Sequence, residues 1–163
     1  MSISRRPWLV PSILGALVLV AAVVVGVLAW QSFSDSRAEA AKAQALDTAR
    51  SSSAQILSYD AKTLDADVAK SRKLVSGEFA VSFEQLVATV IDPVAKQAGL
   101  SNKATVTRAA VIDSRPDQLD ALLFVNQTST APTQPQPASV MNQIKVTMTK
   151  VGDQWLVSGM QPL

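Results

Sequence analysis

The pattern of apolar and polar positions divides the 163-residue chain into three parts. An uncharged apolar stretch occupies residues 7–34 and is followed by an Ala-rich segment without Pro or Gly up to residue 58. Apolar side chains then recur at the three- and four-residue spacing of an α-helix as far as Gly99. Beyond Gly99, stretches rich in Val, Ile, Thr and Leu alternate with turn residues, which is typical of strands. The pattern predicts an α+β chain behind a membrane segment.

The uncharged stretch is long enough to cross a bilayer. Its apolar core runs from Trp8 to Trp30, whereas a membrane helix needs about 20 residues. Tryptophan favours the headgroup layer, so the two indoles fit the two ends of a span. Arg5 and Arg6 lie on the short side and hold the N-terminus in the cytoplasm. A cleaved secretory peptide is the alternative, because residues 27–29 offer a cut site.

These features predict a single-pass protein of the inner, cytoplasmic membrane, with its C-terminal domain on the outer, periplasmic side. The expected parts are a cytoplasmic N-terminus, a transmembrane helix, a juxtamembrane helix and an exported domain, over residues 1–7, 8–30, 31–45 and 46–163. One side of the membrane helix carries small residues that let another helix approach closely. The predicted partner-contact residues on this helix face are Ser12, Ala16, Leu19, Ala22 and Gly26.

The exported part begins with three predicted helices. The first continues from the membrane, and its docking onto a core is expected to begin near Leu46. The second is expected to start at Thr63 or Asp65, which can cap free N–H groups, and to stop at Gly77. The third is expected to end at Gly99, with a kink or restart at Pro93. Its predicted buried stripe consists of Phe79, Phe83, Leu86, Val87, Val90 and Val94.

Four antiparallel strands are predicted after these helices, over residues 104–113, 119–128, 140–151 and 154–160. Turns are expected at Pro116-Asp117 and at Gly152-Asp153, where Gly and Asp tolerate positive φ. The second strand is apolar on both faces and is therefore expected to be an inner strand. The connection over residues 129–139 contains three prolines and is expected to be an exposed loop. The third strand is predicted to turn Val140, Ile144, Val146 and Met148 towards the core.

Composition removes several classes of function. With Arg5 and Arg6 set aside, the 15 basic residues become 13, equal to the 13 acidic residues, so no basic field attracts nucleic acid. The chain has no Cys and no His, which excludes thiolate chemistry, a Ser-His-Asp triad and the commonest metal ligands. The acids around Asp113, Asp117 and Asp120 match no calcium-loop spacing. We therefore expect no enzyme activity, no catalytic residues, no cofactor and no metal.

Four short strings carry a resemblance to a known family. They are Ser58-Tyr59-Asp60-Ala61-Lys62-Thr63-Leu64-Asp65, Ser76-Gly77-Glu78-Phe79, Leu123-Phe124-Val125-Asn126-Gln127-Thr128 and Trp155-Leu156-Val157-Ser158. In this order behind one anchor, the chain resembles the actinobacterial Mce-associated membrane proteins, whose NTF2-like domain packs helices into a curved sheet. The resemblance implies a non-enzymatic accessory subunit that stabilises or positions an Mce lipid-import transporter. The implied partners are Mce transporter subunits and the phospholipid bilayer.

Three alternatives remain open at this point. A scaffold subunit of a secretion or conjugation machine also pairs one anchor with an NTF2-like domain. A lipid-pocket protein would hold its ligand inside the domain. An NTF2-like isomerase or dehydratase would need an acid or base inside the cone, and Asp120, on the strand face of Leu122 and Phe124, is the reasonable candidate.

Overall fold

The structure is a computed structural model that describes residues 37–134 and 136–163. The chain divides into two compact units, Met1–Ala40 and Ala41–Leu163. Of the first unit only residues 37–40 are described, and they are helical. The expected membrane helix over residues 8–30 and its partner-contact face lie outside the described residues. Within the described ranges, no helix combines the length and the apolar character that crossing a membrane requires.

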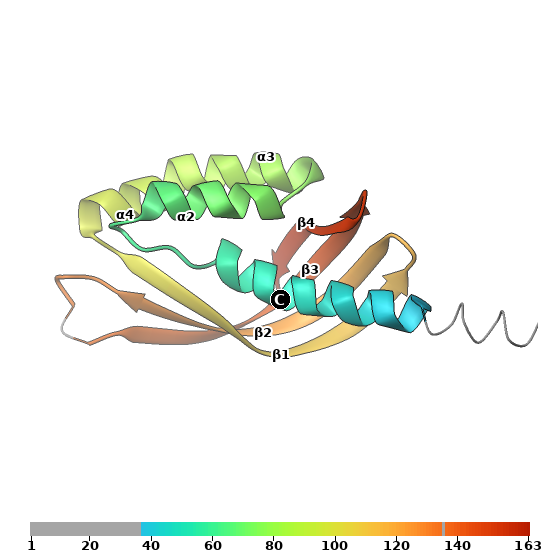
Figure 1. Ribbon diagram of the computed structural model, residues 1–163. Coiled ribbons are helices and arrows are strands. Elements are labelled where there is room, and N and C mark those ends of the chain that lie inside the picture. Colours follow the sequence, from blue (N-terminus) through green and yellow to red (C-terminus); the bar gives the residue numbers. More distant parts are fainter. Residues whose placement is uncertain (1–36, 135) are drawn as a thin grey trace, which may run out of the picture. The chain divides into compact units, whose positions relative to one another are not determined.

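The second unit contains one antiparallel sheet with its strands in sequence order, β1-β2-β3-β4 (Figure 1). The strands are β1 (Ser101–Arg115), β2 (Gln118–Thr130), β3 (Ala138–Val151) and β4 (Gln154–Pro162). The hairpin turns at residues 116–117 and 152–153 lie where the sequence predicts them, and Gly152 has a φ of 61°. The inner position of β2 is also confirmed.

The proline-containing loop between β2 and β3 is shorter than predicted. Thr128 pairs with Ser139 and Ser129 pairs with Ala138, so the strands extend into the expected loop. Only residues 131–137 remain between the strands, and 132–134 and 136–137 are exposed. The Ser and Thr residues near the prolines led to the prediction of a loop. Cross-strand pairing of residues 128–129 with 138–139 instead keeps these residues extended.

The helical part contains α2 (Leu64–Ser71), a 3₁₀ turn (Arg72–Leu74), α3 (Gly77–Leu86), a π-helical turn (Val87–Ile91) and α4 (Asp92–Ala98). Gly99 ends α4 in the left-handed region, as predicted. The prediction for Gly77 is wrong, since Gly77 opens α3 and does not close α2. The chain leaves the helix earlier because Val75 bridges to Val157 and the Ser76 N–H donates to the Val157 carbonyl at 2.8 Å.

The π-helical turn changes which side of the third helix is buried. Phe83 and Val87 are buried as predicted, but Leu86, Val90 and Val94 are 47%, 49% and 38% exposed. Pro93 follows this turn, and its ring cannot donate a hydrogen bond and crowds the carbonyl four residues earlier. A π-helical turn also rotates the residues after it relative to those before it. These two effects leave Val90 and Val94 on the surface, whereas Leu86 lies before the turn and is exposed independently of it.

Small side chains form the buried face of the first helix, which the structure describes over residues 37–56. Burial begins at Ala45, one residue before the expected docking point. The buried positions recur at helical spacing and are Ala45, Ala49, Ser52, Ser53 and Ile56. Side chains of this size let the helix backbone come close to its neighbours.

The core lies between this helical layer and one face of the sheet (Figure 1). On β2, alternate residues Leu119, Ala121, Leu123 and Val125 are buried. On β3, Ile144, Val146 and Met148 are buried as predicted, but Val140, near the start of the strand and close to the β2–β3 loop, is 56% exposed. Trp155 is 6% exposed. The predicted α+β class is confirmed, with helices packed on a four-strand antiparallel sheet.

Candidate functional site

Asp120 lies on the sheet face that points away from the helices. On β2 it alternates with the buried residues Leu119 and Ala121. Its Oδ2 lies 2.8 Å from Lys145 Nζ, and its Oδ1 has no hydrogen-bond partner among the described residues. Burial is the largest single influence and raises the pKa of Asp120, but the interactions with Lys145, Thr147 and Gln118 together outweigh it and leave the pKa below the usual range. The carboxyl group is therefore an ionised ion-pair partner outside the cone.

The other acids of the first hairpin are also held by local interactions. Asp113 Oδ2 lies 3.0 Å from Arg115 Nη2. The Asp117 carbonyl accepts a hydrogen bond from the Lys150 N–H at 2.8 Å, which ties the hairpin turn to β3. Over the described parts of the chain, no group of three acidic, His or Cys side chains is placed to hold a metal ion.

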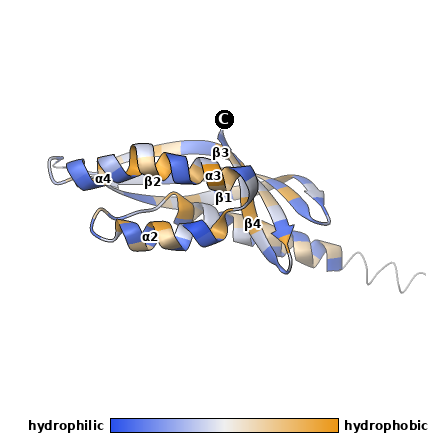
Figure 2. Ribbon diagram, turned by 90° about the horizontal axis from the view of Figure 1, so that it is seen from above, coloured by the Kyte–Doolittle hydropathy of each residue, from blue (hydrophilic) through white to orange (hydrophobic). Residues whose placement is uncertain are grey.

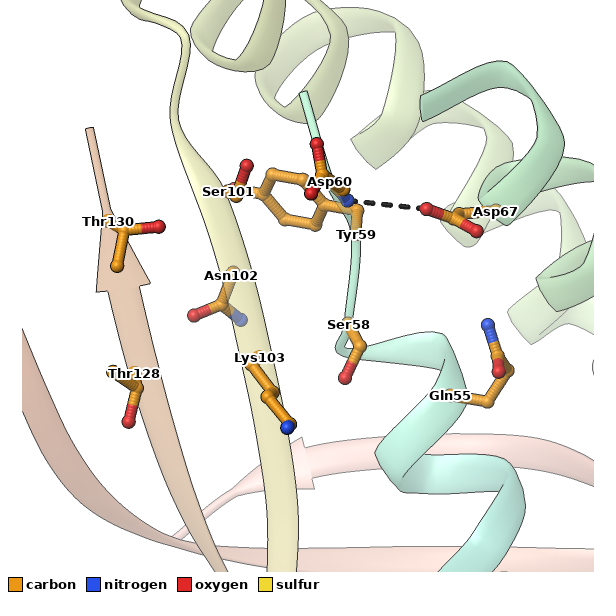
Figure 3. Close-up of a pocket in the computed structure, with 10 residues that line it drawn as sticks. All are labelled: Gln55, Ser58, Tyr59, Asp60, Asp67, Ser101, Asn102, Lys103, Thr128 and Thr130. Atoms are coloured by element: carbon orange, nitrogen blue, oxygen red, sulfur yellow. Dashed lines mark hydrogen bonds between the residues drawn. The ribbon is translucent and has the colours of Figure 1, made fainter. Parts of the chain in front are cut away.

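A polar groove lies between the end of the first helix, α2 and the outer ends of β1 and β2 (Figure 3). Asp67 crosses part of this groove and accepts hydrogen bonds from Thr63 Oγ1 at 2.8 Å and from the Asp60 N–H at 3.3 Å. The hydrogen bond from Thr63 is the largest cause of a lowered Asp67 pKa. Burial raises the pKa of Tyr59, whose backbone pairs with Asn102. These contacts fasten the chain before α2 onto β1.

A second hollow, which we call the helix–sheet cavity, has a volume of about 520 Å³. Its helical wall is apolar and includes Ile56, Leu57, Phe79, Phe83, Leu86 and Ile91. Tyr59, in the segment after the first helix, adds a phenol to the lining. Its sheet wall combines Ile144, Met160 and Pro162 with the neutral polar residues Asn102, Gln127, Ser129 and Asn142. The volume and the mixture of an apolar wall with a few polar groups are those of a small-molecule pocket.

Three of the polar residues hold one another in place. Asn102 Nδ2 donates to the Leu57 carbonyl at 2.7 Å and to Gln127 Oε1 at 3.2 Å. Ser129 Oγ donates to Asn102 Oδ1 at 3.1 Å. Because Gln127 Oε1 is already an acceptor, its amide nitrogen is the group left for another partner. Asn142 lies on the neighbouring strand opposite Val125.

No motif in the sequence marks Asn102, Ser129 or Asn142, and Gln127 occurs only within one of the four strings that carry the resemblance. The signal was present in β2, where the core-facing positions change from Leu119, Ala121, Leu123 and Val125 to Gln127 and Ser129. A core face that becomes polar before its strand ends indicates a hollow or a solvent boundary. The register that brings Asn102 and Asn142 to the same place was not predictable from the separate strands.

Exposed apolar side chains also recur along the third helix. We call Leu86, Val90 and Val94 the apolar row, since they recur every four residues along α3, the π-helical turn and α4. Apolar residues recur along α3 and towards α4 in the hydropathy colouring of Figure 2. The predicted contact residues Ser12, Ala16, Leu19, Ala22 and Gly26 are not among the described residues.

Two mycobacterial proteins are similar to the whole chain or most of it. The uncharacterized protein Rv1362c of Mycobacterium tuberculosis is 33% identical over 165 residues, covering 100% of this chain and 74% of its own. Outer membrane protein Rv1973 of the same species is 32% identical over 138 residues, covering 85% of this chain and 86% of its own. The chain belongs to the family of these two proteins. No protein-family model matches the chain.

Solved structures share the fold of this family member at low sequence identity. An IcmL-like type IV secretion system protein of Legionella pneumophila has a TM-score of 0.65 at 15% identity, covering 75% of this chain and 91% of its own. Agrobacterium tumefaciens VirB8 has a TM-score of 0.56 at 14% identity, covering 74% and 92%. The periplasmic domain of DotI has a TM-score of 0.59 at 14% identity, covering 72% and 91%.

The likeness confirms the NTF2-like fold that the sequence predicts. The names of these proteins place Rv1973 in the outer membrane and the DotI domain in the periplasm, so both are proteins of the cell envelope. None of the five proteins compared above is named as Mce-associated.

Proposed function

We propose that this protein is a non-enzymatic scaffold subunit of a multiprotein assembly in the cell envelope. The observation that carries the proposal is the fold, whose match covers about three quarters of the chain and more than nine tenths of each of the three solved structures. The IcmL-like neighbour is named as a type IV secretion system protein, and a domain that works by holding subunits together needs surfaces and not reactive groups.

The apolar row supports a role in protein contact. Single exposed apolar side chains are ordinary on a protein surface, but rows of them mark interaction sites. Leu86, Val90 and Val94 are each more than a third exposed and stand at consecutive four-residue intervals. Their partner in this proposal is an apolar helix or sheet face of another subunit of the same assembly.

The position of Asp120 favours scaffold over enzyme. An isomerase or dehydratase of this fold needs its acid or base inside the cone, where burial shifts the pKa towards neutrality. Asp120 lies on the opposite sheet face, where Lys145, Thr147 and Gln118 together hold its pKa below the usual range despite its burial. A carboxyl group in this state is a weak base, and Asp120 lines neither the polar groove nor the helix–sheet cavity.

Two assemblies fit the proposal. The fold neighbours favour a secretion or conjugation machine. The four sequence strings, by contrast, favour an accessory role beside an Mce lipid-import transporter. In both, we place the membrane helix at residues 8–30, the N-terminus in the cytoplasm and the domain outside. A reporter fused after Leu163 tests this orientation, because only a reporter that works outside the cytoplasm is expected to be active.

Purification of the full chain in mild detergent, followed by mass spectrometry of its cross-linked partners, tests the function. Secretion or conjugation subunits among the cross-linked proteins support the first assembly, and Mce transporter subunits support the second. A chain that cross-links reproducibly to no envelope subunit contradicts both. Asp120→Asn serves as the control, since it removes the only candidate acid and is expected to leave the partner set unchanged.

A further inference from the structure

We propose that the helix–sheet cavity binds an uncharged amphiphile, with its hydrocarbon part against α3 and its hydroxyl or carbonyl head at Gln127 and Asn142. This is a binding site within the domain and goes beyond the proposed scaffold role. It does not depend on which assembly contains the protein. The proposal rests on the size of the cavity, on its division into an apolar and a polar part, and on the charge of its lining.

The apolar part of the cavity suits a hydrocarbon chain or ring. Phe79, Phe83 and Ile91 line the helical side, and Ile144 and Met160 face them from the sheet. The volume of about 520 Å³ lies within the range of pockets that enclose small organic ligands. Moving a hydrocarbon from water onto such a wall is favourable, because it removes apolar surface from water.

The polar part offers hydrogen bonds that the domain leaves unused. Ser129 Oγ donates a hydrogen bond to Asn102 Oδ1, and Asn102 Nδ2 donates one to Gln127 Oε1. The second hydrogen bond holds the Gln127 side chain in place through its oxygen. The Gln127 amide nitrogen and the whole Asn142 amide have no hydrogen-bond partner among the described residues. Both side chains are only partly exposed. They can donate to a ligand oxygen, and Asn142 can also accept from a ligand hydroxyl.

The charge of the lining selects a neutral head group. Among the described residues that line the cavity, none carries a positive or negative charge. A carboxylate or phosphate placed at Asn142 would lose its hydration without gaining a cation, which is unfavourable. A hydroxyl, ester or amide loses less hydration and regains hydrogen bonds from the two amides.

The cavity reaches the surface, so a ligand can enter without unfolding the domain. Two of its lining residues, Leu86 and Pro162, are exposed, and they come from α3 and from the end of β4. Entry therefore lies between the helix and the sheet edge.

Photolabelling of the full chain in membranes tests this site. The probe is a long-chain primary alcohol with a diazirine in its chain, and the comparison probe is the carboxylate of the same length. We expect the alcohol to label peptides from α3 and β4, with competition by unlabelled 1-decanol, and the carboxylate to label them at least about tenfold less. Asn142→Leu is expected to weaken labelling by the alcohol about tenfold, because one or two hydrogen bonds to a neutral group are lost.

Asn126→Leu is the matched control, since Asn126 lies on the same sheet but outside the cavity lining. It is expected to leave labelling unchanged. Labelling confined to peptides outside the cavity, equal labelling by the carboxylate, or insensitivity to Asn142→Leu in a folded protein would each overturn the proposal. Cross-linking of envelope subunits in the same membranes reports on the scaffold role separately.

Discussion

Ser53 is a fully buried serine whose hydroxyl has no hydrogen-bond partner among the described residues. An unsatisfied buried hydroxyl destabilises a fold, and alanine is also the better helix former. We therefore expect Ser53→Ala to raise the free energy of unfolding of residues 41–163 by about 1 kcal/mol. Urea denaturation followed by circular dichroism measures this difference.

Ser51→Ala separates burial from helix propensity. Ser51 is exposed on the same helix, and its hydroxyl donates to the Asp47 carbonyl at 3.1 Å. Both substitutions gain helix propensity, but only Ser53→Ala removes an unpaired buried hydroxyl. A stabilisation by Ser51→Ala as large as that by Ser53→Ala would show that burial of the hydroxyl has no effect.

The ion pair of Asp120 with Lys145 predicts a pH dependence. The folded pKa of Asp120 lies below its ordinary value of 3.8. The stabilisation is therefore complete above the ordinary value and is lost as the pH falls through the folded pKa. We expect wild type to be more stable than Asp120→Asn by about 1 kcal/mol at pH 7 and by much less at pH 3. Urea denaturation of both proteins at pH 7 and pH 3 measures this difference in the free energy of unfolding. An equal difference at the two pH values would contradict the ion pair.

At the scale of elements, the end of α4 and the loop after β2 are in contact. Gly99 has a φ of 63°, and a Cβ placed on it would lie 3.0 Å from Pro132 Cδ. Alanine there is expected to cost about 1 to 2 kcal/mol for the left-handed backbone and about 1 to 3 kcal/mol more for the crowding. Thermal unfolding of the variant measures the sum.

Gly152→Ala is the control for this contact. Gly152 has a φ of 61°, but a Cβ there meets nothing within 4 Å. It should therefore show only the backbone cost. If Gly99→Ala and Gly152→Ala lost equal stability, the contact between Pro132 and position 99 would have no energetic effect.

The contrast between the hairpin turns and the π-helical turn explains which elements were predictable. Gly152-Asp153 encodes its turn locally, because the positive φ of a two-residue turn suits few residues other than Gly. The π-helical turn before Pro93 interrupts the regular helical spacing, and periodicity alone made Val90 a core residue. The turn that local backbone chemistry determines was therefore predictable from the sequence. The change in the buried side of the helix was not.

The same distinction applies to the candidate sites at the scale of the whole molecule. The alternation in β2 grouped Asp120 with Leu122 and Phe124, but the hypothesis that this face lines the cone was wrong, because the buried face of β2 is that of Leu119 and Leu123. Only the register of three strands brings Asn102, Gln127 and Asn142 to one end of a cavity. The exclusion of thiolate and triad chemistry needed nothing beyond composition. A binding site made of Asn and Gln amides and apolar side chains has no sequence motif. It could therefore be identified only from the three-dimensional structure.

The scaffold account makes the apolar row the part of the domain that contacts other subunits. Replacing Val90 and Val94 together with serine removes apolar surface without touching the cavity, because neither residue lines it. Ile112→Ser with Val151→Ser is the matched control, since these residues are 54% and 52% exposed on the sheet.

The most direct test is the amount of envelope subunits that co-purify with the tagged full chain in mild detergent. We expect Val90→Ser with Val94→Ser to reduce co-purification about tenfold or more, as the loss of a central apolar contact does. The Ile112 and Val151 control is expected to retain the wild-type amount, with both variants inserted and folded. If the chain purified alone, or if the row variant retained its full partner set, the scaffold account would be contradicted.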